Sequence, residues 1–268
     1  MFNRVRSFSH ATTDSSLYGP EFDAAQLPVE LREMYENWAQ SEDAGAFMND
    51  AVAESDWPIT IFVPQRYEEC YAYPLIIWLH SDDTDEDQLE DVMEAISPQN
   101  YVGLSLRGNH FERRTGGYRW NMESAHFGNV PLPELLHVTT CRMRKAFHIH
   151  SERIFLAGSG SGADAALQLL VHKSEWFAGA ILLDPIGKPD SIRGERLTGI
   201  CSKAILQTQS RAANPEQLAR NLEAVRLLRS AGARVKVELT DTAIDPTGDN
   251  MRFLDHWIMN QLNGTALV

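Results

Sequence analysis

The stretch Arg153–Asp164, RIFLAGSGSGAD, decides the fold of this chain. Its first half, Arg153 to Ala157, has the length and the apolar character of a buried β-strand. Gly158, Gly160 and Gly162 then alternate with serines, which indicates a tight turn, and the alanine-rich continuation is typical of a helix. A buried strand that turns directly into a helix is a basic unit of α/β proteins.

Short β-rich runs alternate with amphipathic helices along the rest of the chain. This alternation predicts an α/β fold with a mostly parallel central sheet and helices on both faces. One helix is expected to begin at Asn214 and Pro215 and to end near Gly232, and the last helix is expected over Met251 to Leu262. The predicted strands are Ile59–Val63, Leu75–Leu79, Tyr101–Leu106, Ile154–Ala157, Ala178–Leu183, Ala204–Gln207 and Val235–Leu239.

The composition indicates a globular domain with an acidic balance. The chain has 268 residues, 43% of them apolar, and its 24 basic and 37 acidic side chains give a net charge of -13. This charge repels phosphate backbones and anionic lipid headgroups, so neither nucleic acid nor a membrane is expected as a partner. No apolar run approaches the roughly 20 residues that span a bilayer, and the N-terminus lacks the apolar core of a signal peptide. We expect a cytoplasmic protein.

Two regions are expected along the chain. Residues 1–55 are predicted to form an N-terminal arm and a helix, which begins near Pro28, and residues 56–268 are predicted to form the α/β domain. The three cysteines of the chain are Cys70, Cys141 and Cys201. Their wide spacing does not suggest a metal or redox site, and we expect no cofactor.

Five segments follow one another in the order found in α/β-hydrolases. They are YPLIIWLH, RIFLAGSGSGA, FAGAILLDP, LLRSAGARVKVEL and DHWIMNQL. On these segments, within about 59–262, the chain resembles phospholipase/carboxylesterase and dienelactone-hydrolase-like predicted esterases. The resemblance implies the α/β-hydrolase fold. It also implies which positions of this chain correspond to the catalytic serine, acid and histidine and to the oxyanion loop of an active relative.

The resemblance places the catalytic serine seven residues after Arg153, and that position is Gly160. The turn that carries such a serine, the nucleophile elbow, strains its central residue by roughly 1–3 kcal/mol, and glycine adopts these backbone angles without the penalty of a Cβ. The glycine therefore preserves the turn and removes the nucleophile. Ser159, in a small-x-Ser-x-small pattern, and Ser161, which fits less well, are the candidate replacements. Alternatively, both hydroxyls satisfy hydrogen bonds of the turn and the helix start.

The acid and base positions also depart from the family pattern. Four residues before Pro215, where the resemblance implies an aspartate, the chain has Arg211, and a cation does not orient an imidazole as a carboxylate does. Asp184 is a candidate acid from the end of the preceding strand, or a turn residue that closes that strand. The loop 240–250 contains no histidine, so His256 in the last helix is the nearest candidate base.

The segment after Leu79 corresponds to the oxyanion loop of the family. Where the family has His-Gly, this chain has His80 and Ser81, followed by Asp82 and Asp83. Backbone N–H groups of this loop remain able to form an oxyanion hole. However, two carboxylates beside them oppose the charge of a developing oxyanion.

A basic and aromatic segment follows the strand that ends at Leu106. It lies near the edge of the sheet where α/β proteins bind ligands, and its arginines fit a carboxylate or another small anion. The alternative is that these arginines neutralise acidic helix starts of the protein itself. The candidate ligand-binding residues are His80, Ser81, Arg107, Arg119 and Trp120.

An acidic segment has the spacing of an EF-hand calcium loop, with Asp83, Asp85, Asp87 and Glu94 at ligand positions. The glycine required at the sixth position is replaced by Gln88. Acidic residues also stabilise a helix start through the helix dipole. The segment therefore predicts a solvated helix start, and we expect no metal site.

These departures support one main hypothesis and two alternatives. The main hypothesis is a non-catalytic α/β-hydrolase homologue, a pseudo-esterase, which binds a small molecule or a protein. The first alternative is a carboxylesterase-type serine hydrolase that uses Ser159 or Ser161 with Asp184 and a histidine. The second is a structural or assembly subunit. A homo-oligomer is compatible with each of them.

Overall fold

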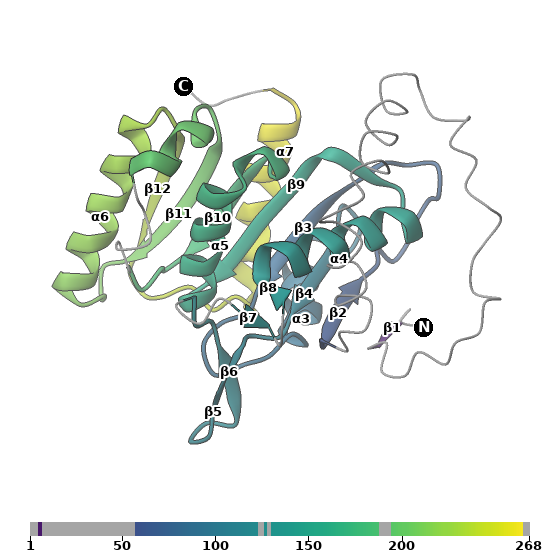
Figure 1. Ribbon diagram of the computed structural model, residues 1–268, viewed down its shortest axis with the longest axis horizontal. Coiled ribbons are helices and arrows are strands. Elements are labelled where there is room, and N and C mark those ends of the chain that lie inside the picture. Colours follow the sequence, from purple (N-terminus) through teal and green to yellow (C-terminus); the bar gives the residue numbers. More distant parts are fainter. Residues whose placement is uncertain (1–4, 7–56, 123–125, 128–129, 188–193, 265–268) are drawn as a thin grey trace.

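The computed structural model describes residues 5–6, 57–122, 126–127, 130–187 and 194–264. Within these ranges the chain forms a central sheet with helices packed on both faces (Figure 1). The predicted N-terminal arm and its helix lie outside the described residues, except for Val5 and Arg6.

The central sheet is mostly parallel, as predicted. Its strands in the described residues are β1 (Val5–Arg6), β2 (Ile59–Phe62), β3 (Tyr73–Leu79), β4 (Val102–Leu106), β9 (Ile149–Ser159), β10 (Gly179–Leu183), β11 (Ala204–Ser210) and β12 (Arg234–Thr240). They lie in the order β1-β2-β4-β3-β9-β10-β11-β12. The β1–β2 and β2–β4 pairs are antiparallel, and every pair from β4 to β12 is parallel. The continuous apolar sequence of β3 fits this position, because a central parallel strand is buried on both faces.

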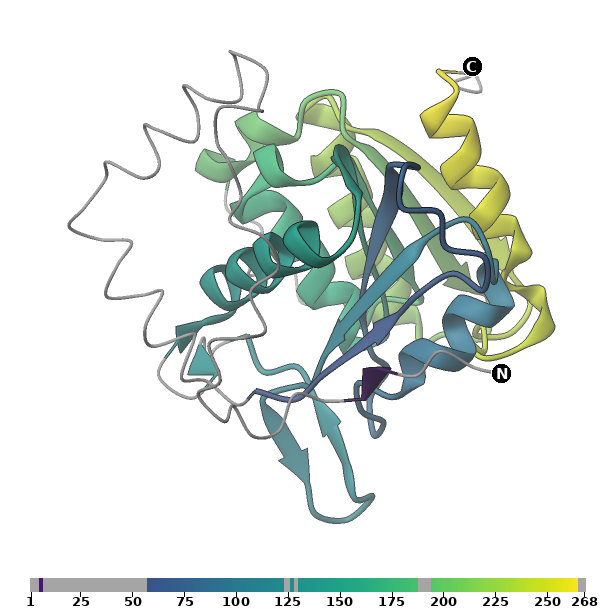
Figure 2. The same ribbon diagram turned by 90° about the vertical axis from the view of Figure 1, so that its right-hand side faces the viewer.

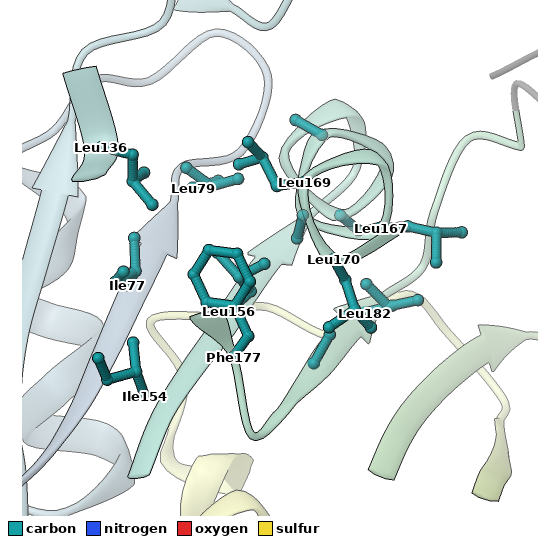
Figure 3. Packing of buried hydrophobic residues seen from close by; sticks show 14 of the residues in the cluster. Ile77, Leu79, Leu136, Ile154, Leu156, Leu167, Leu169, Leu170, Phe177 and Leu182 are labelled. Carbon is teal, nitrogen blue, oxygen red and sulfur yellow. The ribbon is translucent and has the colours of Figure 1, made fainter. Parts of the chain in front are cut away.

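Helices cover both faces of the sheet. In the described ranges they are α3 (Gln88–Ile96), α4 (Leu132–Ala146), α5 (Ser161–His172), α6 (Pro215–Ser230) and α7 (Arg252–Leu262), with short 3-10 helices at Ser174–Trp176, Gly194–Ile200 and Asp249–Met251. Helices α4, α5 and α6 contribute to one hydrophobic cluster, and α3 and α7 contribute to the other. In the first cluster, Leu156 and Leu182 of the sheet lie close to Leu167 and Leu170 of α5 (Figure 3). None of these helices is long and apolar enough to cross a membrane.

The start of α6 confirms the sequence-based prediction. The side chain of Asn214 accepts a hydrogen bond from the backbone N–H of Glu216 at 2.9 Å, and Pro215 occupies the first turn. The helix ends at Ser230, and Gly232 follows with a φ of +88°, a conformation that favours glycine.

Two features were not predicted from the sequence. One is helix α4 itself. The other is a hairpin, β5 (His110–Glu112) and β6 (Gly117–Arg119), which projects from the body of the protein (Figures 1 and 2). The remaining short strands, β7 (His126–Phe127) and β8 (Val130–Pro131), pair with each other. The basic and aromatic segment of the sequence therefore forms the hairpin and its flanks.

Candidate functional site

The nucleophile elbow predicted from the sequence lies at the carboxyl end of β9. This strand pairs with β3 on one side and β10 on the other, so the turn lies in the middle of the sheet. Gly160 has φ +59° and ψ -122°, and α5 begins at the next residue, Ser161. A Cβ atom on Gly162 would lie 2.1 Å from the carbonyl oxygen of Leu79, so the turn packs directly against the end of β3. The elbow geometry is present without a side chain at its centre.

The carboxylate of Asp82 occupies the space that a side chain at position 160 would need. A Cβ atom built on Gly160 would lie 2.9 Å from Oδ2 of Asp82. Oδ1 of the same carboxylate accepts a hydrogen bond from the Ser161 hydroxyl at 2.6 Å, and Oδ2 accepts one from the Ser161 backbone N–H at 3.3 Å. Asp82 follows β3 and Ser161 follows β9, so the carboxylate joins the ends of two adjacent strands.

These contacts concern the group that stabilises the oxyanion in active hydrolases of this fold. In such enzymes the backbone N–H of the residue after the nucleophile donates to the developing oxyanion. The corresponding residue here is Ser161, and its N–H donates to Asp82. The N–H that would stabilise an oxyanion in such an enzyme therefore has a carboxylate of this chain as its acceptor.

His80 lies beneath this turn as a fully buried, neutral imidazole. Its Nε2 accepts a hydrogen bond from the backbone N–H of Gly108 at 2.8 Å, so the proton belongs on Nδ1, which lies 2.8 Å from the carbonyl oxygen of Ser81. Desolvation lowers the pKa of His80. The indole N–H of Trp120 donates to the backbone carbonyl of His80 at 3.1 Å. These side chains fix the loop that carries Asp82.

Arg107 and Arg119 have carboxylate partners within the chain. Arg107 makes a bidentate pair with Glu86, with distances of 2.7 and 2.5 Å, and these hydrogen bonds raise the pKa of the guanidinium. Arg119 donates to Asp83 at 2.9 and 3.0 Å. A hydrogen bond from Thr115, together with those from Arg119, lowers the pKa of Asp83. The two arginines neutralise the acidic loop before α3, which is the second of the two roles considered from the sequence.

Asp184 is held by backbone groups at the ends of two neighbouring elements. Its Oδ1 accepts from the N–H of Ser210 at 2.6 Å, and its Oδ2 accepts from the N–H of Ile244 at 2.8 Å. Its φ of +45° is unusual for a residue with a side chain. The carboxylate therefore ties the end of β10 to the end of β11 and to the loop after β12.

The remaining candidate residues lie apart from one another. Ser159 is the buried last residue of β9, whereas His256 is exposed on α7 with its Nδ1 3.0 Å from the carbonyl oxygen of Arg252. Arg211 is exposed and pairs with Asp241 at 3.1 Å. Among the described residues, Ser159, Asp184 and His256 share no hydrogen bond with one another.

Some of the candidate residues predicted from the sequence thus lie close together around the elbow, and the others lie apart from them. The gathered residues are His80, Ser81, Trp120 and Ser161, with Arg119 4.0 Å from Asp82. Asp82 was not among the candidates, although its charge next to the oxyanion loop was noted as a departure from the family. That departure was the only signal of its role in the sequence.

Several solved structures have a fold similar to that of this chain. The chain is similar to a carboxylesterase of Bacillus cereus, with a TM-score of 0.61 and 18% identity over 80% of this chain and 99% of the other. It is also similar to a carboxylesterase from Mesorhizobium loti, with a TM-score of 0.57 and 17% identity over 76% and 94% of the two chains. An S-formylglutathione hydrolase from Staphylococcus aureus has a TM-score of 0.57 and 12% identity over 77% and 93%. No protein-family model and no curated protein matches the sequence.

At these identities the comparison concerns the fold alone. The chain has the α/β-hydrolase fold, as the resemblance implied, with the elbow, the preceding strand and the following helix in their expected places. The activity must be argued from the site of this chain.

Proposed function

We propose that this protein is a non-catalytic α/β-hydrolase homologue that acts by binding. The position of Asp82 is the observation that carries the proposal. The elbow has glycine where the nucleophile belongs, and the N–H of Ser161, the expected oxyanion donor, is already bonded to Asp82. An ester substrate would have to displace this carboxylate, and its developing oxyanion would be repelled by it.

A protein partner is favoured over a small-molecule ligand. The side chains proposed from the sequence to hold a ligand have partners inside the chain, because Arg107 pairs with Glu86 and Arg119 pairs with Asp83. A small anion would compete with these carboxylates for both guanidinium groups, which lowers its net binding energy. A protein partner that binds elsewhere on the surface meets no such cost.

Serine reactivity tests the first half of this proposal. The purified full chain is treated with a fluorophosphonate probe and, separately, with short-chain p-nitrophenyl esters, beside an active carboxylesterase as positive control. The variants are Ser159→Ala and Ser161→Ala, with Ser230→Ala, an exposed serine on α6, as the matched control. We expect neither labelling nor turnover in any of the four proteins. Labelling that Ser159→Ala or Ser161→Ala abolishes, and Ser230→Ala preserves, would overturn the proposal.

One contact favours a second candidate, an esterase that uses Ser161. Its hydroxyl donates to Asp82 at 2.6 Å, which is a strong hydrogen bond to a possible base. Two features count against it: Ser161 lies one residue past the centre of the elbow, and a carboxylate is a weaker general base than an imidazole. This candidate requires that Asp82→Asn abolish labelling, whereas the non-catalytic protein is unlabelled with either residue.

A further inference from the structure

The strand β12 forms an edge of the central sheet. In the described residues it has β11 on one side and no strand on the other, next to α6 (Figure 1). The N–H of Arg234 and the carbonyl of Thr240 both bond to residues that flank β11. Because successive residues of a strand turn their backbone groups to opposite sides, Val235, Val237 and Leu239 direct their N–H and C=O groups outward. Within the described part of the chain, no strand pairs with this outer edge, and of its backbone groups the carbonyl of Val235 accepts a hydrogen bond from Arg229.

The sequence of this edge is complementary to itself when reversed. We propose that two copies of the chain form a dimer by antiparallel pairing of β12 with β12, about a two-fold axis at Val237. In this register Val237 faces its own copy, and Val235 faces Leu239, all through outward-directed backbone groups. Lys236 then lies opposite Glu238 of the second copy on both sides of the axis, at the closely spaced positions where opposite charges stabilise a pair of strands.

Apolar side chains beside this edge fit the same partner. Leu239 is 56% exposed and Leu222 on α6 is 42% exposed. The guanidinium of Arg229 donates to the carbonyl of Val235 at 2.9 Å, so this flank of α6 lies over the outer edge of β12. Leu222 precedes Arg229 by seven residues, about two helical turns, and therefore lies on the same flank. The dimer would bury both leucines next to the paired strands.

Arg229 is compatible with this arrangement. The carbonyl of Val235 is the group that would accept the N–H of Leu239 from the second copy, and a carbonyl oxygen has two lone pairs. In one chain alone, Lys236 pairs with Glu238 at 2.7 Å, and the dimer exchanges these two contacts, one in each chain, for two contacts between the copies. An unrelated partner would not require a sequence that is complementary to its own reverse, whereas a two-fold dimer does.

The test measures the mass of the full chain in solution by size-exclusion chromatography with light scattering, over a series of concentrations. We expect the wild type to have the mass of two chains, twice 30.2 kDa. Lys236→Glu and Glu238→Lys each place like charges opposite each other, so each variant is expected to have the mass of one chain. The double variant restores both pairs and is expected to be dimeric again.

Mixing the two single variants separates pairing between copies from an effect within one chain. The first carries Glu at 236 and 238 and the second carries Lys at both, so together they are expected to form a heterodimer although each alone is monomeric. Leu222→Asp is expected to halve the mass as well. Leu227→Asp, on the opposite flank of α6 with 39% exposure, is the matched control and is expected to remain dimeric. Circular dichroism confirms that each variant is folded.

A wild type that has the mass of one chain throughout would overturn the proposal, as would single variants that stay dimeric or fail to associate on mixing. The inference is independent of the proposed function, because the elbow follows β9 in the middle of the sheet and β12 lies at its edge. Loss of the dimer leaves the serine-probe result unchanged, and a positive serine-probe result leaves the dimer unchanged.

Discussion

Replacing Gly160 by alanine tests whether the elbow and Asp82 are adapted to each other. The backbone at this position has φ +59° and ψ -122°, which a residue with a Cβ adopts at a cost of about 1–3 kcal/mol. The new Cβ would also lie 2.9 Å from Oδ2 of Asp82. Because that oxygen is at the end of a side chain, rotation of Asp82 relieves the contact, and its hydrogen bonds to Ser161 are lost.

The two costs are separable in a double-mutant cycle with Asp82→Ala. Hydrogen bonds to a charged group contribute about 1.5–3 kcal/mol, and the lower end applies because the Asp82 side chain is 27% exposed. Gly160→Ala is therefore expected to lower the free energy of unfolding by the strain term alone when residue 82 is alanine. With Asp82 present, it is expected to cost roughly 1.5 kcal/mol more.

Urea-induced unfolding of the four proteins, followed by circular dichroism, measures the cycle. The reasoning fails if Gly160→Ala costs nothing in the Asp82→Ala background, because the strain at the elbow would then be absent. It also fails if the cost of Gly160→Ala is equal in the two backgrounds, because residue 82 would then not fill the space beside position 160.

Substitutions at two further positions test the groups that surround the elbow. Burial lowers the pKa of His80, so the imidazole binds a proton more weakly in the folded chain than in the unfolded chain, where its pKa is 6.5. The contribution of neutral His80 to stability is therefore complete above pH 6.5 and is lost as the pH falls below that value. His80→Gln, whose amide oxygen can accept the N–H of Gly108, is expected to reduce the pH dependence of urea unfolding in that range, and an unchanged dependence would contradict this origin. Asp184→Ala leaves the N–H groups of Ser210 and Ile244 without their acceptor, which is expected to cost about 1–3 kcal/mol of unfolding free energy for each group. Asp184→Asn keeps an acceptor oxygen and tolerates the positive φ, so its loss is expected to be smaller. Equal losses of unfolding free energy in the two variants would refute this role of Asp184.

The sequence predicted those features of the fold that depend on neighbouring residues. The run from Arg153 to Ala157 followed by Gly160 specifies a strand, a turn with positive φ and a helix, and all three are present. Asn214 and Pro215 specified a helix start in the same way. The hairpin was missed, although Gly116 and Gly117 are a turn signal where its second strand begins, because its arginines suggested a ligand-binding loop.

The contacts of the site depend on residues that are distant in the sequence. Asp82 and Ser161 are separated by 79 positions, and only the pairing of β3 with β9 brings their loops together. The local sequence of Asp184 fitted both a catalytic acid and a turn residue, and its two backbone partners lie 26 and 60 positions away. No local pattern determines which groups such a carboxylate meets.

The contacts of Asp82 give a physical reason for an elbow to persist without its nucleophile. The carboxylate bonds to the first residue of α5 and lies 4.0 Å from Arg119, which itself belongs to the hairpin strand β6. One side chain therefore links the loop after β3, the start of α5 and the base of the hairpin. A serine at position 160 would place a Cβ within 2.9 Å of Oδ2 and compete for this space. Glycine at the elbow and aspartate in the oxyanion loop are thus two parts of one structural arrangement, and a nucleophile restored at position 160 would require Asp82 to leave its present position.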